Sequence, residues 1–197
     1  MGTAWLIRAT THSDLLIRAH QRSIKVVTIH NASIINAVGV CGLQLYNFGQ
    51  VVSIPFFTAR WRPESFYDKI HANDAMDLHT LCLLDIKVKE QSEENLFKGI
   101  RKYEPPRFMT ANEAIEQLIE VESKRKQGVL VWDREIVVMA RVGSESQQIV
   151  FGSIEELKHA DFGKELHSII IPSRKMHELE RKVLKELYEY KKDLSIK

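Results

Sequence analysis

Cysteine is scarce in this chain, with only Cys41 and Cys82 among its 197 residues. Both lie in apolar runs without a second Cys or a His at ligand spacing, so the sequence contains no zinc motif. Free, buried thiols in a reducing compartment are the expected state of such cysteines. No apolar run approaches the roughly 20 residues that a membrane span needs, and no signal-peptide pattern is present. We therefore expect a soluble cytoplasmic protein without a membrane partner.

Excess charge of one sign is also missing. The formal net charge is +2, and no block of five like charges occurs. A charge this small does not indicate nucleic-acid binding, so we expect no direct contact with DNA or RNA. The nucleophile motif G-x-S-x-G is absent as well. The composition, 44% hydrophobic and 27% charged, is that of a globular protein long enough for one large domain or two small ones.

What is present is an alternation of strand-like and helix-like segments, which predicts an α/β protein. Helices are expected at Thr11–Arg22 and Ile34–Val38, after Pro63, after capping boxes at Thr110/Glu113 and Ser153/Glu156, and over the amphipathic run Met176–Leu187. The expected strands are Lys25–His30, Gln50–Ile54, Leu78–Val88, Ile136–Val142 and Leu166–Ile171. The aromatic and basic stretch 56–62 predicts a packed crossover, which divides the chain into domains 1–56 and 57–197.

One ligand edge follows from this pattern. In open α/β sheets, ligands bind beyond the carboxyl ends of the strands. The switch from strand to helix at Asn31-Ala-Ser-Ile34 places the Ser33 hydroxyl and main-chain N–H groups there, although Ser33 is equally suited to be a structural N-cap. Asp85 and Lys87 form either a salt bridge or a functional pair. Arg62 either binds an anion or anchors the crossover.

Five segments together carry a resemblance to a known family. They are Ala9-Thr-Thr-His-Ser-Asp14, His30–Gly39 (preceded by Ile29), Trp61–Phe66, His79-Thr-Leu-Cys-Leu-Leu-Asp-Ile-Lys-Val-Lys-Glu90 with Gln91, and Tyr103-Glu-Pro-Pro-Arg107. They occur in the order of the eukaryotic diphthine synthases, and weaker agreement continues through Met139–Gly143 and Leu166–Ser168. The sequence resembles that family from about Ala9 to Ile171.

The resemblance implies a two-domain fold of the tetrapyrrole-methylase type and usually a homodimer. It implies S-adenosylmethionine as the cofactor, bound between the domains, and elongation factor 2 as the substrate, methylated on its modified histidine precursor in diphthamide biosynthesis. The cofactor-binding residues that it implies are Ser33, Ile34, Leu84, Met139, Ala140 and His167. The apolar Leu84 and Met139 would pack the adenine, and His167 would contact the nucleoside through its ring or its main chain. No catalytic residue and no metal ligand are implied.

The sequence departs from the family at its N-terminal end. Where the family has a Gly-Asp-Pro segment and a small residue before Ala-Thr-Thr-His, this chain has Ala4-Trp-Leu and Arg8. Trp5 thus replaces an acidic cofactor contact, and the family's first strand with its glycine-rich loop has no counterpart. We therefore expect a first domain that is truncated at its N-terminus, weak cofactor binding, and a C-terminal part that is the more stable unit. The alternative hypothesis is a catalytically inactive binding or dimerisation module of the same family.

Overall fold

The computed structural model describes residues 10–27, 33–91, 95, 97–99 and 101–191. Its helices are α1 (Thr10–Gln21), α2 (Ile34–Ala37), α3 (Ser65–Ala75), α5 (Ala111–Arg125), α6 (Ile154–Leu157) and α7 (Glu178–Tyr188), with 3-10 helices η1 (Val38–Cys41) and η2 (Leu45–Asn47). Its strands are β1 (Val52–Ile54), β2 (Thr80–Leu84), β3 (Ile86–Lys87), β4 (Arg107–Phe108), β5 (Glu135–Ala140), β6 (Gln148–Ser153) and β7 (His167–Ile171). The predicted mixture of helices and strands is confirmed.

One five-stranded sheet organises the described chain, in the order β1-β2-β7-β5-β6. β1 runs parallel to β2, and the other neighbours are antiparallel. Four of the five strands were predicted. β6 was not, because only its residues 149–151 form an apolar run, and its place is fixed by pairing with β5 over six residues.

Two further differences from the predicted strands concern strand ends. The long strand expected over Leu78–Val88 is interrupted at Asp85, so that β2 belongs to the main sheet and β3 to a separate two-stranded ribbon with β4. Residues 25–27 of the strand expected at Lys25–His30 are exposed and form no strand, and residues 28–30 lie outside the described part. An apolar run alone therefore did not make a strand here, since a strand also needs a neighbour to pair with.

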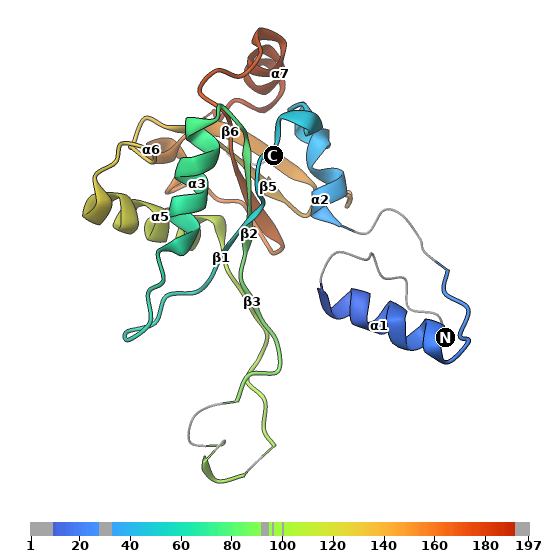
Figure 1. Cartoon of the computed structure of the whole chain (residues 1–197). Helices are drawn as coiled ribbons and strands as arrows, with labels where there is room; N and C mark the ends of the chain where they lie inside the picture. The colour runs from blue at the N-terminus through green and yellow to red at the C-terminus, as the bar shows by residue number, and fades with distance from the viewer. Residues whose placement is uncertain (1–9, 28–32, 92–94, 96, 100, 192–197) are drawn as a thin grey trace.

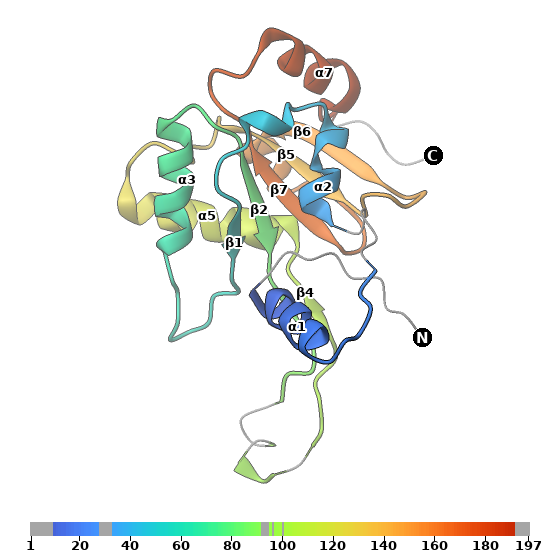
Figure 2. The same cartoon turned by 45° about the vertical axis from the view of Figure 1, so that its right-hand side comes forward.

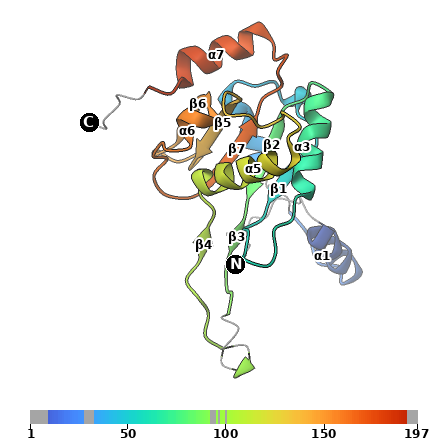
Figure 3. The same ribbon diagram turned by 90° about the vertical axis from the view of Figure 1, so that its left-hand side faces the viewer.

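Helices cover both faces of the sheet (Figures 1 and 2). On one face, α3, α5 and α6 bury a core that includes Tyr67, Ile115 and Leu157. The start of α5 confirms the expected capping box, since the Thr110 side chain accepts the Glu113 N–H. Figure 3 shows α5 crossing this face beside α3. On the opposite face, the segment α2–η1 and helix α7 bury a second cluster, with Val38, Cys41 and Leu184 among its members.

The crossover after β1 is packed, as predicted. Phe56 is 3% exposed, and the Arg62 guanidinium pairs with Glu120 of α5 and donates to the Thr58 carbonyl. Arg62 therefore anchors the crossover. The division into domains 1–56 and 57–197 stays a prediction. β1 lies on its N-terminal side and pairs with β2 on the other side. No described helix has the length and apolar character needed to cross a membrane.

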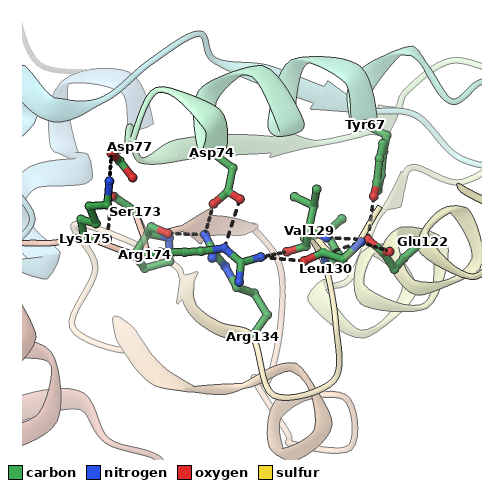
Figure 4. A network of polar contacts seen from close by, with 12 residues as sticks. Tyr67, Asp74, Asp77, Glu122, Val129, Leu130, Arg134, Ser173, Arg174 and Lys175 are labelled. Carbon is green, nitrogen blue, oxygen red and sulfur yellow. Dashed lines mark hydrogen bonds and ion pairs between the residues drawn. The ribbon is translucent and has the colours of Figure 1, made fainter. Parts of the chain in front are cut away.

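The edge of the sheet at which β7 ends is closed by a network of polar groups, most of them buried (Figure 4). The Asp74 carboxylate of α3 forms ion pairs with Arg134 at 2.8 Å and with Arg174 at 3.1 Å. Glu122 accepts the Tyr67 hydroxyl at 2.6 Å and the N–H groups of three residues, 128–130. Although burial alone would raise it, these hydrogen bonds lower the pKa of the Glu122 carboxyl.

A histidine and a glutamate complete this sealed edge. His79 is fully buried just before β2, and its Nδ1 accepts the Ser173 N–H at 2.9 Å. Its Nε2 therefore carries the proton and faces Glu180 Oε1 of α7 at 3.2 Å. Burial lowers the pKa of the His79 imidazole in spite of the nearby carboxylate. The first residue of the most family-like motif is thus a structural link between sheet and helix.

Candidate functional site

The opposite edge of the sheet brings four of the six implied binding residues together, namely Leu84, Met139, Ala140 and His167. The carboxyl ends of β1, β2 and β5 meet there with the start of β7, because β7 runs antiparallel to β2 and β5. Leu84 ends β2, Ala140 ends β5, and His167 begins β7 opposite Ala140. We call this row of strand ends the candidate edge. Because ligands of open α/β sheets bind beyond the carboxyl ends of strands, this edge is where a ligand is expected.

Ser33 and Ile34 lie at the start of α2, on one face of the sheet. The Ser33 hydroxyl accepts the Ile35 N–H at 3.3 Å, so it is used as an N-cap, and the residue is 7% exposed. Ile34 packs against the cluster that contains Met139. Because α2 is a single turn of four residues, its helix dipole is weak. Ser33 therefore fixes the chain direction at the start of α2.

The implied residues divide between the two faces of the sheet. Met139 and Ile34 belong to the cluster under α2, whereas Leu84 and Ala140 belong to the core under α5. Met139 and Ala140 are fully buried, and Leu84 is 9% exposed. The two side chains belong to clusters on opposite faces of the sheet, so the packing of one adenine ring by both Leu84 and Met139 stays a prediction that this arrangement does not favour. Their shared feature is the main chain at adjacent strand ends.

His167 is held by backbone groups on both sides of its ring. Its Nδ1 accepts the Ala111 N–H at the start of α5 at 3.2 Å, and its Nε2 lies 3.0 Å from the Lys164 carbonyl. Nε2 therefore carries the proton in a neutral ring. Burial is the main reason that the pKa of His167 lies below its ordinary value. With both nitrogens engaged, the ring orients the start of β7, and only the main chain of His167 remains for a ligand.

Arg141, which the sequence reasoning left without a role, organises the loops of this edge. It follows Ala140 with a positive φ of 49°, and its guanidinium donates to the Phe162 and Lys164 carbonyls, both at 2.6 Å. It also donates to the Ser146 carbonyl at 3.0 Å. One side chain thus ties the β5–β6 turn to the loop before His167. Its presence in the family-like segment Met139–Gly143 was the available signal.

Asp85 is likewise a structural group at this edge. Its Oδ2 accepts the Phe56 N–H at 3.0 Å, which joins the ends of β1 and β2. Lys87 pairs with Glu90 at 3.1 Å, and no ion pair between Asp85 and Lys87 occurs within the described residues, so the salt-bridge alternative is wrong. Arg107 of β4 stacks on the Phe56 ring at 4.0 Å and pairs with Glu113 at 2.9 Å.

The other sequence candidates contribute little to a reactive centre. Burial raises the pKa of Cys82 to about 12 and also raises that of Cys41, so neither thiol ionises at neutral pH. No group of three potential metal ligands occurs within the described residues. Trp5 and Arg8 lie outside the described part of the chain.

An apolar hollow of about 440 Å³ lies beside β1, away from the candidate edge. Its lining includes Ile35, Leu45, Phe48, Val51 and Leu81. None of the six implied residues lines it. Its lining is contributed by the segment from α2 to β1 and by Leu81 near the start of β2, so it belongs to the surface of that segment.

Comparison with known proteins gives a consistent result. No protein-family model matches the chain. Diphthine methyl ester synthase from Saccharomyces cerevisiae is 54% identical over 183 residues, which are 93% of this chain and 61% of the yeast protein. The protein of the same name from Dictyostelium discoideum is 52% identical over 94% of this chain and 67% of its own length.

A solved structure agrees in three dimensions. A crystal structure of an Entamoeba histolytica protein assigned as a diphthine synthase superposes with a TM-score of 0.80 and 47% identity. The match covers 92% of this chain and 67% of that protein. The chain therefore spans between 57% and 67% of the length of curated relatives such as those from Yarrowia lipolytica and Dictyostelium discoideum.

Proposed function

Because the chain belongs to the diphthine synthase family, we propose that it is a methyltransferase of diphthamide biosynthesis. Its methyl donor is S-adenosylmethionine, and its substrate is the modified histidine precursor on elongation factor 2. The observation that carries the proposal is identity of more than half the residues over 93% of the chain, including every strand that ends at the candidate edge.

The residues of the candidate edge fit the adenosine half of this cofactor. Ile34 and Leu83 are partly buried apolar side chains on one face, beside the main-chain ends of β2 and β5. Apolar surface with a few main-chain donors and acceptors is the usual lining of a nucleoside site. Ser33, Ile34, Leu84, Met139, Ala140 and His167 would hold the cofactor mainly through their backbone. Because the family's acidic contact is replaced by Trp5, we expect affinity roughly 5- to 150-fold below that of a site with the carboxylate.

The bound cofactor would supply a methyl group carried on a sulfonium, for in-line transfer to an amine or carboxylate of the substrate. The contribution of this chain is then positioning. Arg141 and His167 hold the loops around the strand ends through backbone hydrogen bonds. Asp85 keeps the ends of β1 and β2 together. We assign no catalytic residue.

Calorimetric titration with S-adenosylmethionine tests the site. Ser33→Ala and His167→Ala should each weaken binding, since each removes the hydrogen bond that fixes a segment of the site. His20→Ala is the matched control, because His20 is exposed on α1. Circular dichroism must first confirm the fold, since a lost cap alone costs about 1 kcal/mol. Equal affinity for all three variants would refute the site, and a parent chain that neither binds the cofactor nor methylates elongation factor 2 would refute the function.

The proposal extends to a cytoplasmic homodimer. Val40, Leu45 and Tyr46 are 44%, 53% and 83% exposed on the surface between α2 and β1, which supports a covering subunit. The free, buried Cys41 and Cys82 support a reducing compartment. Sedimentation equilibrium tests the dimer, for which a monomer at micromolar concentration would be the contrary result.

A further inference from the structure

A two-stranded ribbon leaves the body of the protein directly from the candidate edge (Figures 1 and 3). We define the ribbon as residues 86–91 and 101–108. Ile86 pairs with Phe108 and Lys87 with Arg107, and the Glu104 N–H donates to the Glu90 carbonyl at 2.8 Å in the same register. Pro105 and Pro106 lie between these contacts. They offer no N–H donors, so this side of the ribbon is protected from pairing with another strand.

The two faces of the ribbon differ in chemistry. Partners across an antiparallel pair lie on the same face. Lys87 and Arg107 share one face and lie over the Phe56 ring, at 5.7 and 4.0 Å from its centre. Ile86 lies on the other face, and it is 47% exposed. Val88 and Tyr103, further along, are 54% and 53% exposed. A projecting ribbon that exposes apolar side chains in this way has the composition of an interface core.

The part of the ribbon beyond its base carries unpaired positive charge. Lys87 pairs with Glu90 and Arg107 with Glu113, both at the base. Lys89, Arg101 and Lys102 are exposed, and within the described residues none of them forms an ion pair. Glu104 is the one acidic residue of the described ribbon that is likewise exposed and forms no ion pair with a described residue. The surface therefore combines apolar side chains with a net positive rim.

The ribbon is continuous with the proposed site at both ends. β3 begins two residues after Leu84, and β4 ends three residues before Ala111, whose N–H bonds His167. Movement of the ribbon would therefore be transmitted to β2 and to the start of α5. A protein substrate is too large for a pocket, so a surface beside the site must bind it.

We propose that the ribbon is the docking arm for the protein substrate and that it binds an acidic patch with an apolar centre on that protein. This inference rests on the proposed function. The mixed character of the ribbon favours a protein over a nucleic acid, because two of its three exposed apolar residues, Ile86 and Val88, are aliphatic and offer no stacking platform for bases. Complementary charge on the rim would mainly speed association and choose the partner.

The test compares a ribbon variant with a control of the same charge. The ribbon variant carries Lys89→Glu, Arg101→Glu and Lys102→Glu. The control carries Lys69→Glu, Lys126→Glu and Lys185→Glu, which are exposed positions away from the ribbon. Binding to purified elongation factor 2 is measured by biolayer interferometry at low and high salt, and binding of S-adenosylmethionine is measured by calorimetry on the same samples. A third variant, Val88→Ser with Tyr103→Ser, tests the exposed apolar side chains of the ribbon independently of its charge.

We expect the ribbon variant to bind elongation factor 2 at least tenfold more weakly than the parent, with the control unchanged and the cofactor affinity equal in all three. Equal loss in both charge variants, or no loss in either, would overturn the docking arm. So would a ribbon variant that loses self-association or binding to a poly-uridine RNA while keeping the elongation factor. If no sample binds the cofactor or methylates elongation factor 2 but the ribbon variant shows a specific loss of binding to that protein, the proposed function is refuted and the docking arm stands.

Discussion

Replacing Glu180 by alanine tests whether the sealed edge holds the sheet and α7 together. Glu180 is 2% exposed, and its carboxylate serves three donors. Oε1 accepts the Gln44 N–H at 2.7 Å and faces His79 Nε2 at 3.2 Å, while Oε2 accepts the His177 N–H at 2.8 Å. These contacts connect three segments that are far apart in the sequence: the chain before η2, the start of β2, and α7.

The magnitude follows from the donors that the substitution leaves behind. The His79 N–H is fully buried and would cost about 1–3 kcal/mol without a partner. The Gln44 N–H loses a bond to a charged group, worth about 1.5–3 kcal/mol. The His177 N–H belongs to an exposed residue, so water can replace its partner. We expect the free energy of unfolding to fall by about 3–5 kcal/mol, a large part of the usual total of about 5–15 kcal/mol.

Urea denaturation at pH 7.5, followed by circular dichroism, measures this loss. With a slope of about 2 kcal/mol per molar urea, the midpoint should fall by about 1.5–2.5 M. Glu186→Ala on the same helix is the control, because Glu186 is 65% exposed and, within the described part of the chain, pairs only with Lys182 at 3.7 Å. That variant should stay within about 0.5 kcal/mol of the parent. A loss below about 1 kcal/mol for Glu180→Ala would show that water or rearrangement satisfies these donors and that the reasoning is wrong.

Two further predictions concern pH and local stability. Burial lowers the folded-state pKa of His79 below 6.5, so the unfolded chain takes up the proton first as the pH falls. The urea midpoint should therefore fall as the pH drops below about 6.5. A His79→Gln variant with the same pH dependence of the midpoint as the parent would contradict this. Hydrogen exchange should be slowest in Ile136–Ala140, which pairs with strands on both sides, and fast in the exposed residues 24–27; the reverse order in a monomeric sample would refute the weak first segment.

Local patterns in the sequence predicted most of the fold. The capping boxes at Thr110 and Ser153 each depend on two residues three positions apart, and both form as expected. Strong β-branched runs such as Ile136–Val138 predict a strand wherever they pair. Prediction failed where the sequence does not reveal the partner of a strand. β6 was overlooked, and Lys25–Val27 was expected in a strand that the described residues do not contain.

For the candidate site, sequence motifs determined which segments matter, and tertiary structure decided what each side chain does. The motifs led to the strand ends of Leu84, Ala140 and His167, because neighbouring strands carry their loops to a common edge. They could not reveal that Leu84 and Met139 face opposite sides of the sheet, since that depends on the register of pairing. Nor could they reveal the hydrogen bond between His79 and Glu180, 101 residues away, because only the folded chain brings a buried donor to its acceptor.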